Sequence, residues 1–308
     1  MTDSQSSILT DTLIATWRSQ GRDGFLLSDP DAPDIEVRNV ADPISGVSFR
    51  FRWLPHREMR TDIAELERRG ILNPDRDETK LFRDSRDRSG RFCFLCEENI
   101  RECNPMEDLI PMSLAGRRYL AGANFAWISR NHYTVMAAEH IDQDFTPHVL
   151  EAMIELHTRT EGLFRVLYNG AHAGATIPWH LHYQITTDEF PVELLPAGEE
   201  ASYPTAVRRV IAATGTGAEA YEVAAEWIEL DPEHHRVNLL IAGPVGEATG
   251  YIFARDTRKS HAKEKGLMGG FEACGDLVYS EPDKRHLFLH ASAELARRVL
   301  EEIRPDGT

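Results

Sequence analysis

The stretch TIPWHLHYQ, residues 176–184, places His180, His182 and Gln184 at alternate positions. Side chains of a β-strand point alternately to its two faces, so this period predicts a strand with three polar side chains on one face. The apolar side chains between them would face the core: Trp179, Leu181, Tyr183 and Ile185. Two imidazoles about 6.5–7 Å apart along a strand can serve side by side as ligand and nucleophile. The alternative is a pair of solvent-exposed strand histidines.

The composition is that of an ordinary globular protein, with 42% hydrophobic and 27% charged residues. A length of 308 residues predicts about two domains or one large domain. The formal net charge of −16 argues against nucleic acid or anionic lipid as a partner, because such binding needs an excess of Lys and Arg. A small anionic substrate in a local basic pocket is compatible with this charge.

Membrane insertion and export are not expected. The N-terminal stretch MTDSQSSILTDTLIATW has no basic start and no continuous apolar run, and no later segment is long enough to cross a bilayer. We therefore expect a cytoplasmic protein, either a monomer or a homodimer. In a reducing compartment the C-x-x-C of Cys93 and Cys96 suggests a metal site or a redox pair before a structural disulfide.

The order of helices and strands predicts the fold class. Helices are expected around residues 8–17 and 59–71, and a charged connector lies at 75–90. A further helix is expected to start at Thr146 and Pro147 and to continue through Leu163 and Leu167, and a closing helix to end at Arg304. Strands are expected at residues 47–53, 121–129, 132–138, 235–243, 250–256 and 273–280. Because βαβ alternation is absent, the sequence predicts the α+β class, with packed helices on an antiparallel sheet.

The stretch PVELLPAGEEASYPT, residues 191–205, is rich in Pro, Gly and Glu and predicts a domain boundary. We therefore expect an N-terminal extension at 1–90, a catalytic domain at 91–200, starting near Arg91, and a second domain at 201–308. The two strand-rich halves are of similar size, which suggests two related halves.

The cysteines and histidines together predict a metal site. Cys93, Cys96, His140 and one histidine of the H-x-H offer two thiolates and two imidazoles, the ligand set of a closed tetrahedral zinc site. For the C-x-x-C the alternatives are a redox pair or two buried thiols, but the neighbouring acidic Glu97 and Glu98 disfavour a reactive thiolate. His132 competes with His140, and Cys103 could replace one cysteine.

A turn of small residues leads into the histidine strand. Gly170, Gly174, Ala175 and Thr176 offer free backbone N–H groups and one hydroxyl. Such turns allow the backbone to approach an anion closely. Phosphate held beside an imidazole suggests nucleophilic attack on phosphorus.

The sequence AGATIPWHLHYQ resembles the histidine triad superfamily, in the branch that contains galactose-1-phosphate uridylyltransferase, diadenosine tetraphosphate phosphorylase and GDP-galactose phosphorylase. Its signature is a small-residue turn, a proline and His-x-His-x-Gln. The stretches NHYTVMAAEH and GGFEACGDLVYS are similar to other segments of this branch. The resemblance covers residues 90–190 best and implies a histidine-triad-like fold.

The resemblance also implies roles for single residues. His182 would be the nucleophile that takes the nucleotidyl group as a phosphoramidate. Gln184 would donate to a phosphate oxygen without shuttling a proton, which suits transfer to a second substrate. The zinc ligands would be Cys93, Cys96, His140 and His180. The substrate-binding residues would be Asn169, Gly174, Ala175 and Thr176.

Two features modify this picture. The branch reads Pro-His-x-His, whereas Trp179 adds a residue between Pro178 and His180, which puts the alignment of the turn and of Asn169 in doubt. The basic run around Arg258 could grip the non-transferred phosphates, although a solvated loop is an equal alternative.

The sequence thus predicts a nucleotidyltransferase or phosphorylase. Its substrates would be a nucleoside diphosphate sugar or dinucleoside polyphosphate and an acceptor, either phosphate or a sugar phosphate. The alternatives are a nucleotide hydrolase of the same fold and a zinc-stabilised nucleotide-binding module without turnover.

Overall fold

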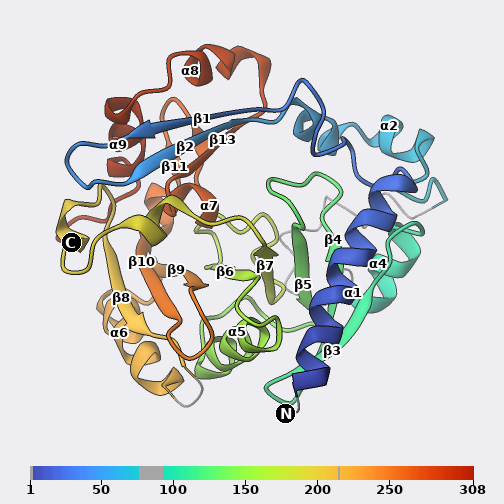
Figure 1. The fold of residues 1–308 in the computed structure, drawn as a ribbon, viewed down its shortest axis with the longest axis horizontal. Coiled ribbons are helices and arrows are strands. Elements are labelled where there is room, and N and C mark those ends of the chain that lie inside the picture. The colour runs from blue at the N-terminus through green and yellow to red at the C-terminus, as the bar shows by residue number, and fades with distance from the viewer. Residues whose placement is uncertain (1–2, 76–92, 214–215) are drawn as a thin grey trace.

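The computed structural model describes residues 3–75, 93–213 and 216–308 (Figure 1). The charged connector beyond Asp75 and the expected domain start at Arg91 lie outside these residues. The elements up to residue 169 are α1 (Asp3–Arg22), β1 (Glu36–Ala41), β2 (Ser48–Trp53), η1 (Pro55–Thr61), α2 (Ile63–Arg68), α4 (Glu97–Cys103), β3 (Ile110–Leu114), β4 (Arg117–Ala123), β5 (Tyr133–Ala137), α5 (Pro147–Arg159) and β6 (Arg165–Asn169).

The later elements begin with the strand that carries the histidine motif. They are β7 (His182–Thr186), η2 (Pro191–Leu194), η3 (Glu200–Ser202), β8 (Val207–Ile211), α6 (Gly217–Leu230), β9 (His235–Ala242), β10 (Thr249–Asp256), η4 (Thr257–Lys259), β11 (His261–Ala262), β12 (Gly266–Leu267), α7 (Gly270–Ala273), β13 (Asp276–Tyr279), η5 (Pro282–Lys284), α8 (Arg285–Leu289) and α9 (Ala293–Glu301). None of the described helices is long and apolar enough to span a membrane.

The described strands form three sheets. The largest has eight strands in the order β3-β4-β5-β7-β6-β9-β10-β8, and all of its pairs are antiparallel. A second sheet has the order β1-β2-β13, in which β13 runs parallel to β2. A short hairpin joins β11 to β12. The predicted α+β class with an antiparallel sheet is confirmed.

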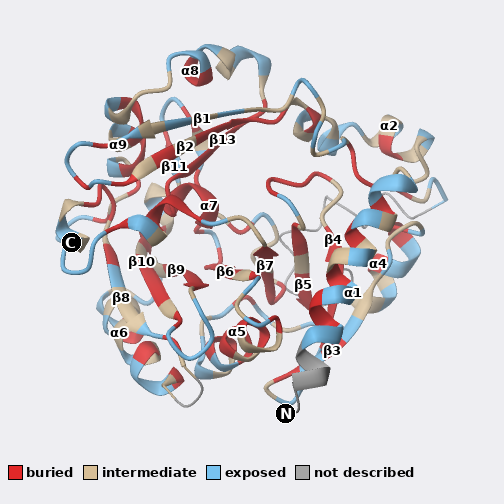
Figure 2. Cartoon of the chain, viewed as in Figure 1, coloured by how far each residue is buried: buried red, intermediate tan, exposed pale blue. Residues whose placement is uncertain are grey.

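Helices cover one face of the large sheet, the face to which Tyr183 points. The Tyr183 hydroxyl meets that of Tyr119 at 3.2 Å, and Tyr119 in turn contacts His148 of α5. On the same face the Tyr133 hydroxyl donates to the Leu13 carbonyl of α1. Figure 2 shows the central strands and the inner side of α5 as buried. On the opposite face, to which Gln184 points, the short helix α7 packs against β6 and β9.

The predicted alternation around the histidines is confirmed only in part. Leu181, Tyr183 and Ile185 are buried in the core, as predicted. The strand begins at His182, however, and residues 178–180 form a turn, so His180 is not a strand residue. Pro178 and the extra Trp179 lie in this turn, which explains why the regular alternation stops there.

Two other predicted boundaries are wrong. The helix that Thr146 caps ends at Arg159, where Glu161 follows with a φ of +54°, and Leu167 lies in β6 instead. The strand expected over 121–129 stops at Ala123, because the chain turns there and the Asn124 amide donates to the His132 carbonyl.

The strands β1 and β8 were not predicted. Both are edge strands, and in their sequences EVRNVA and VRRVI charged side chains interrupt the apolar residues. Edge strands are commonly protected from further pairing by such side chains. The hydrophobic pattern that reveals a central strand is therefore weak in these two.

A buried ion pair ties the two larger sheets together. Arg52 of β2 donates through Nε to both carboxylate oxygens of Asp276 in β13. Its Nη2 lies 2.9 Å from the Asp188 carboxylate beyond β7. The Asp276 side chain is fully buried. The interactions with Asp276 and Asp188 outweigh the cost of burial and raise the pKa of Arg52. The small sheet is therefore fixed beside the strand that carries His182.

Candidate active site and metal centre

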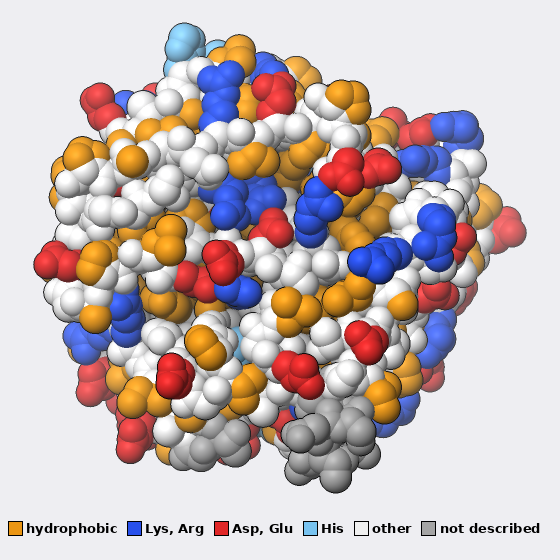
Figure 3. Space-filling view, in the orientation of Figure 1, with side chains coloured by type: hydrophobic (Ala, Val, Ile, Leu, Met, Phe, Trp, Pro, Cys, Tyr) orange, Lys and Arg blue, Asp and Glu red, His pale blue; other side chains and the backbone are white. Residues whose placement is uncertain are grey.

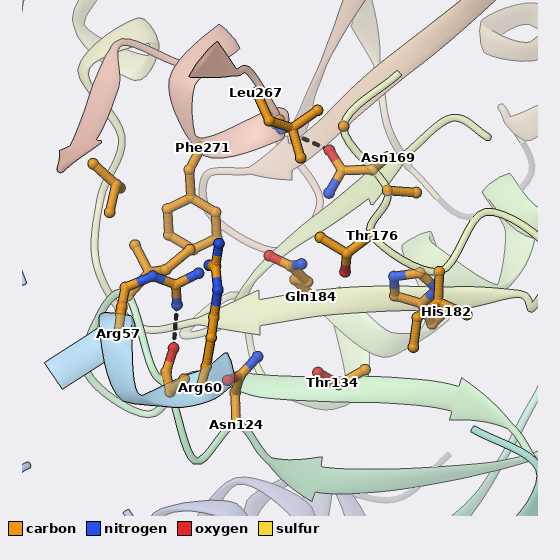
Figure 4. Close-up of a pocket in the computed structure, with 18 of the residues that line it drawn as sticks. Arg57, Arg60, Asn124, Thr134, Asn169, Thr176, His182, Gln184, Leu267 and Phe271 are labelled. Carbon is orange, nitrogen blue, oxygen red and sulfur yellow. Dashed lines mark hydrogen bonds between the residues drawn. The ribbon is translucent and has the colours of Figure 1, made fainter. Parts of the chain in front are cut away.

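A cavity of about 1100 Å³ lies on the face of the large sheet to which Gln184 points. Its floor is formed by β4, β5 and β7, and Gln184 lies directly across from Thr134 on β5. Figure 4 shows His182, Gln184 and Thr176 around one end of this space, with Arg57 and Arg60 approaching from η1. Of the substrate-site residues predicted from the sequence, the structure brings His182, Gln184, Asn169, Gly174, Ala175 and Thr176 into this one lining.

The hydrogen bonds of His182 define its tautomer. Its Nδ1 lies 2.8 Å from the backbone carbonyl oxygen of His180. A carbonyl only accepts, so Nδ1 carries the proton and Nε2 has a free lone pair. Burial lowers the pKa of His182 to about 4, which keeps the ring neutral at physiological pH. His182 therefore presents an unprotonated imidazole nitrogen.

Gln143 clamps the backbone on which His182 lies, a role that sequence reasoning missed. Its Oε1 accepts from the His182 amide at 2.7 Å, and its Nε2 donates to the carbonyls of His182 and Asn169 at 3.1 and 2.8 Å. The side chain is buried. A single glutamine in a loop gives no periodic signal in the sequence. The role of Gln143 becomes visible only in the structure, where residues 141–145 lie beside β6 and β7.

Gln184 lies beside a neutral histidine. The Nδ1 of His132 accepts from the Ile128 amide at 3.0 Å, so its proton is on Nε2, the nitrogen directed to Gln184. Burial, aided by the charge of Arg57, lowers the pKa of His132 to about 3. Gln184 itself lines the cavity, where its amide NH₂ group can donate to a ligand.

The small-residue turn closes over the floor as the sequence suggested. Gly174 has a φ of +104°, and a Cβ there would lie 2.4 Å from the Cα of Gly269. Only glycine fits this contact, and it brings the turn against the segment before α7. Asn169 accepts from the Gly270 amide at 2.6 Å (Figure 4), so its side-chain oxygen is occupied and its NH₂ group remains available.

Cationic side chains line the wall opposite the turn. Arg57 donates to the Ala126 carbonyl and lines the cavity with Arg60, Lys265 and Lys284. Burial, together with the nearby charge of Arg60, lowers the pKa of Arg57 to about 9. Figure 3 shows basic side chains gathered beside a hollow near the centre of one face, with acidic ones among them. An acidic protein thus presents a local basic surface.

The structure corrects the expectation for Arg258. Its guanidinium is paired with Asp256 and Asp231 and does not line the cavity. Sequence reasoning favoured it because it stands in a basic run, whereas Arg57 and Arg60 stand apart in the sequence, in a segment with no such run. The capping carboxylate of Asp256, which also accepts from the Arg258 amide, holds the side chain against η4.

The four predicted metal ligands meet at one point. The ligand atoms of Cys93, Cys96, His140 and His180 all lie within 4.8 Å of one another. Sulfur-to-Nδ1 distances are 3.2 Å for Cys93 and His180 and 3.7 Å for Cys96 and His140. Ligand atoms around a tetrahedral zinc ion are about 3.3–3.8 Å apart, given bond lengths of about 2.0–2.3 Å. The cluster therefore can hold a metal ion.

The surroundings of the cluster also suit a metal. The Nε2 of His180 lies 2.8 Å from the Ala137 carbonyl, which fixes its proton there and leaves Nδ1 as the ligand atom. The hydrogen bond with Cys96 and the neighbouring His180 lower the pKa of Cys93, which favours the thiolate that a metal requires. Neither Cys103 nor His132 belongs to this group.

The chain is similar to one protein family in sequence and to solved structures in fold. A family described as a domain of unknown function, DUF4922, matches residues 50–187. No curated protein sequence gives a significant match.

Solved structures of yeast Ap4A phosphorylase Apa2 are similar over nearly the whole chain. The complex with AMP has a TM-score of 0.59 at 14% identity, covering 97% of this chain and 98% of the other. The complex with Ap4A has the same TM-score and identity, with 96% of each chain covered. Apa2 alone gives a TM-score of 0.58 at 16% identity, with 96% and 97% covered. The chain therefore has the fold of yeast Ap4A phosphorylase Apa2, and the resemblance inferred from AGATIPWHLHYQ is confirmed at the level of the fold.

Proposed function

We propose that the protein is a nucleotidyltransferase or phosphorylase that works through a covalent nucleotidyl-histidine. The donor is a nucleoside diphosphate sugar or a dinucleoside polyphosphate, and the acceptor is inorganic phosphate or a sugar phosphate. The similarity to Apa2, whose structures contain AMP and Ap4A, supports a nucleotide substrate.

One observation carries this proposal. The hydrogen bond from His182 Nδ1 to the carbonyl oxygen of His180 leaves Nε2 unprotonated, so that it can act as a nucleophile in the cavity. In the first step a bond forms between Nε2 and the α-phosphorus, and the bond from this phosphorus to the leaving group breaks, which releases a sugar phosphate or a nucleoside polyphosphate. In the second step an acceptor oxygen attacks the phosphorus and the N–P bond breaks. His182 is then free for the next cycle.

Other residues that line the cavity can stabilise the negative charge of the transferred group. The NH₂ groups of Gln184 and Asn169 and the hydroxyl of Thr176 can donate to non-bridging phosphate oxygens. Arg57 and Arg60 offer positive charge for the phosphates that leave or arrive. Glutamine does not carry a proton to or from water, so the intermediate is preserved for an anionic acceptor.

We further propose zinc for the cluster of Cys93, Cys96, His140 and His180. Two thiolates and two imidazoles form a ligand set that zinc commonly takes in closed, structural sites. The cluster supplies no open position for substrate, and its role is to hold the turn before β7.

The test is mass spectrometry of the intact protein after incubation with a panel of nucleotide sugars and dinucleoside polyphosphates. A stable increase in mass that equals one nucleotidyl group is expected with the correct donor, and added phosphate should remove it. His182→Ala should abolish the increase and the turnover while nucleotide binding persists, because the substitution leaves the remaining lining intact.

Other outcomes would change the conclusion. Product formed with water as the only acceptor would indicate a hydrolase. Tight binding without any product would indicate a binding module. A mass increase that persists in His182→Ala would remove this residue from its role.

A further inference from the structure

A carboxylate without a cationic partner lies at the far end of the cavity. Glu107 lines this end, and among the described residues its carboxylate has one hydrogen-bond donor, the Asn104 amide at 2.8 Å. Burial raises the pKa of Glu107 to about 7. A buried carboxylate that lacks a counter-charge is costly unless further donors reach it.

Asn104 supplies a second unsatisfied acceptor at the same place. This residue is only 3% exposed, and its Oδ1 has no hydrogen-bond partner in the described parts of the chain. Its NH₂ group is directed to Glu107, so Oδ1 is the end that remains for a ligand. Native structures rarely leave such an atom unpaired, and one that lines a cavity points to a bound group with N–H donors.

The sheet makes room for the carboxylate. A Cβ at Gly122 on β4 would lie 1.8 Å from Glu107 Oε1, so the carboxylate occupies the space of the missing side chain. Gly122 lies opposite Thr134, and Thr134 opposite Gln184. With strands about 4.8 Å apart, roughly 10 Å of floor separates Gly122 from Gln184. This is comparable to the reach of a nucleoside monophosphate from its phosphorus to the far edge of its base.

Apolar side chains enclose the space between these ends. They come from α2, the segment before α4, and α4 itself: Leu66, Leu72, Phe94, Leu95 and Ile100. A flat, largely apolar base fits such walls, with polar contacts confined to its edge.

We infer that Glu107 and Asn104 bind the Watson–Crick edge of guanine and make the cavity specific for guanine nucleotides. This inference rests on the proposed nucleotidyl transfer and narrows its substrate class. The guanine edge presents three hydrogens, one on N1 and two on the 2-amino group. The Glu107 carboxylate accepts from N1 and the amino group, and Asn104 Oδ1 accepts the remaining amino hydrogen.

Adenine matches these acceptors less well. Its N1 is an acceptor, and it would face the carboxylate lone pairs without a hydrogen between them. A site built to receive N–H donors rejects a ligand that lacks them, because its own buried groups then remain unpaired. Hypoxanthine, which keeps N1–H and lacks the 2-amino group, should be intermediate.

The test is isothermal titration calorimetry of the full chain with GMP, IMP and AMP, which needs no turnover. The unsubstituted protein should bind GMP tightest, IMP next and AMP weakest, with GMP and AMP separated roughly 10- to 100-fold, as expected for a hydrogen-bonded charge. In Glu107→Gln the side chain offers one donor and one acceptor, a pattern that matches adenine. GMP binding should fall about tenfold or more, and AMP binding should rise.

Glu102→Gln is the matched control, because Glu102 is exposed near the end of α4, shortly before Glu107 in the chain, and does not line the cavity. It should keep the original order of affinities. Tightest binding of AMP by the unsubstituted protein, or an unchanged ratio in Glu107→Gln, would overturn the inference. If Glu107→Gln does not fold, the series of GMP, IMP and AMP on the unsubstituted protein decides alone.

The two proposals can fail separately. Preference for AMP with a nucleotidyl-protein still formed would overturn the guanine assignment and leave nucleotidyl transfer standing. Preference for GMP with no mass increase under any donor would overturn nucleotidyl transfer and leave the guanine assignment standing. Failure to bind all three mononucleotides would overturn the base site.

Discussion

In the proposed reaction, the side chain at position 184 would decide which acceptor can use the nucleotidyl-histidine. Gln184 lies two residues beyond His182 on the same face of β7, and both line the cavity. An amide at this position donates to phosphate oxygens, whereas an imidazole could also move a proton. The choice between transfer and hydrolysis is therefore expected to depend on this one side chain.

We expect Gln184→His to lower transfer to phosphate and to raise the share of hydrolysis, because an imidazole can remove a proton from attacking water. The measurement is the ratio of phosphorolysis to hydrolysis products at fixed phosphate concentration. The double variant with His182→Ala should form neither product. An unchanged ratio in Gln184→His would mean that exclusion of water, and not position 184, sets the choice.

At the residue level the sequence was informative where the functional groups stand at fixed spacing. The H-x-H-x-Q and the C-x-x-C contain His182, Gln184 and three of the cluster's four residues. Gln143, Arg57 and Glu107 could not be predicted, because each reaches the site by a loop or short helix that returns across the sheet. Hydrophobic periodicity reports the local element but not the place to which such a segment returns.

The metal cluster joins elements that are otherwise unconnected at this edge. Cys93 and Cys96 immediately precede α4, His140 follows β5, and His180 precedes β7. The backbone carbonyl of His180 also accepts the hydrogen bond from the Nδ1–H of His182. An ion in the cluster would therefore fix both the turn and the tautomer of the nucleophile.

Protein purified without added metal should contain about one zinc per chain, as a single closed four-ligand site requires. Cys96→Ser should lose this zinc and melt at lower temperature, since metal binding is coupled to folding. His182→Ala should keep it, because His182 is not in the cluster. Metal content by plasma mass spectrometry and melting by calorimetry measure both effects. Zinc lost from both variants, or from neither, would contradict the division between His180 and His182.

Elements were predicted best where the segment is rich in buried apolar side chains. The strands β2, β5, β9 and β10 and the start of α5 agree with the sequence for this reason. The turn at residues 178–180 was taken as strand, since Trp179 and Leu181 continue the alternation. Its true path depends on the cluster with Cys93 and Cys96, which no local pattern contains.

On the scale of the whole molecule, the Arg52 network joins the sheet of β1, β2 and β13 to the large sheet. We expect Arg52→Met to lower the free energy of unfolding by about 3 kcal/mol, because it leaves the buried Asp276 with only Arg50 as a partner. Urea unfolding followed by tryptophan fluorescence measures this loss. The exposed Arg208, paired loosely with Glu226, serves as the control, and Arg208→Met should change stability little. Equal stability of both variants would show that packing alone holds the sheets together.

The pairing of β2 with β13 also sets the order of events while the chain is being synthesised. Residues Ser48–Trp53 emerge early, whereas their parallel partner Asp276–Tyr279 is added on the order of 10–45 s later at ordinary translation rates. During that interval the apolar Phe49 and Phe51 have β1 as a partner on one edge and none from β13 on the other. The segment η1, which carries Arg57 and Arg60, directly follows β2, so the basic wall is not held in place before β13 docks. A nascent chain can thus form its histidine strand well before the basic wall is held in place, which requires residues 276–279.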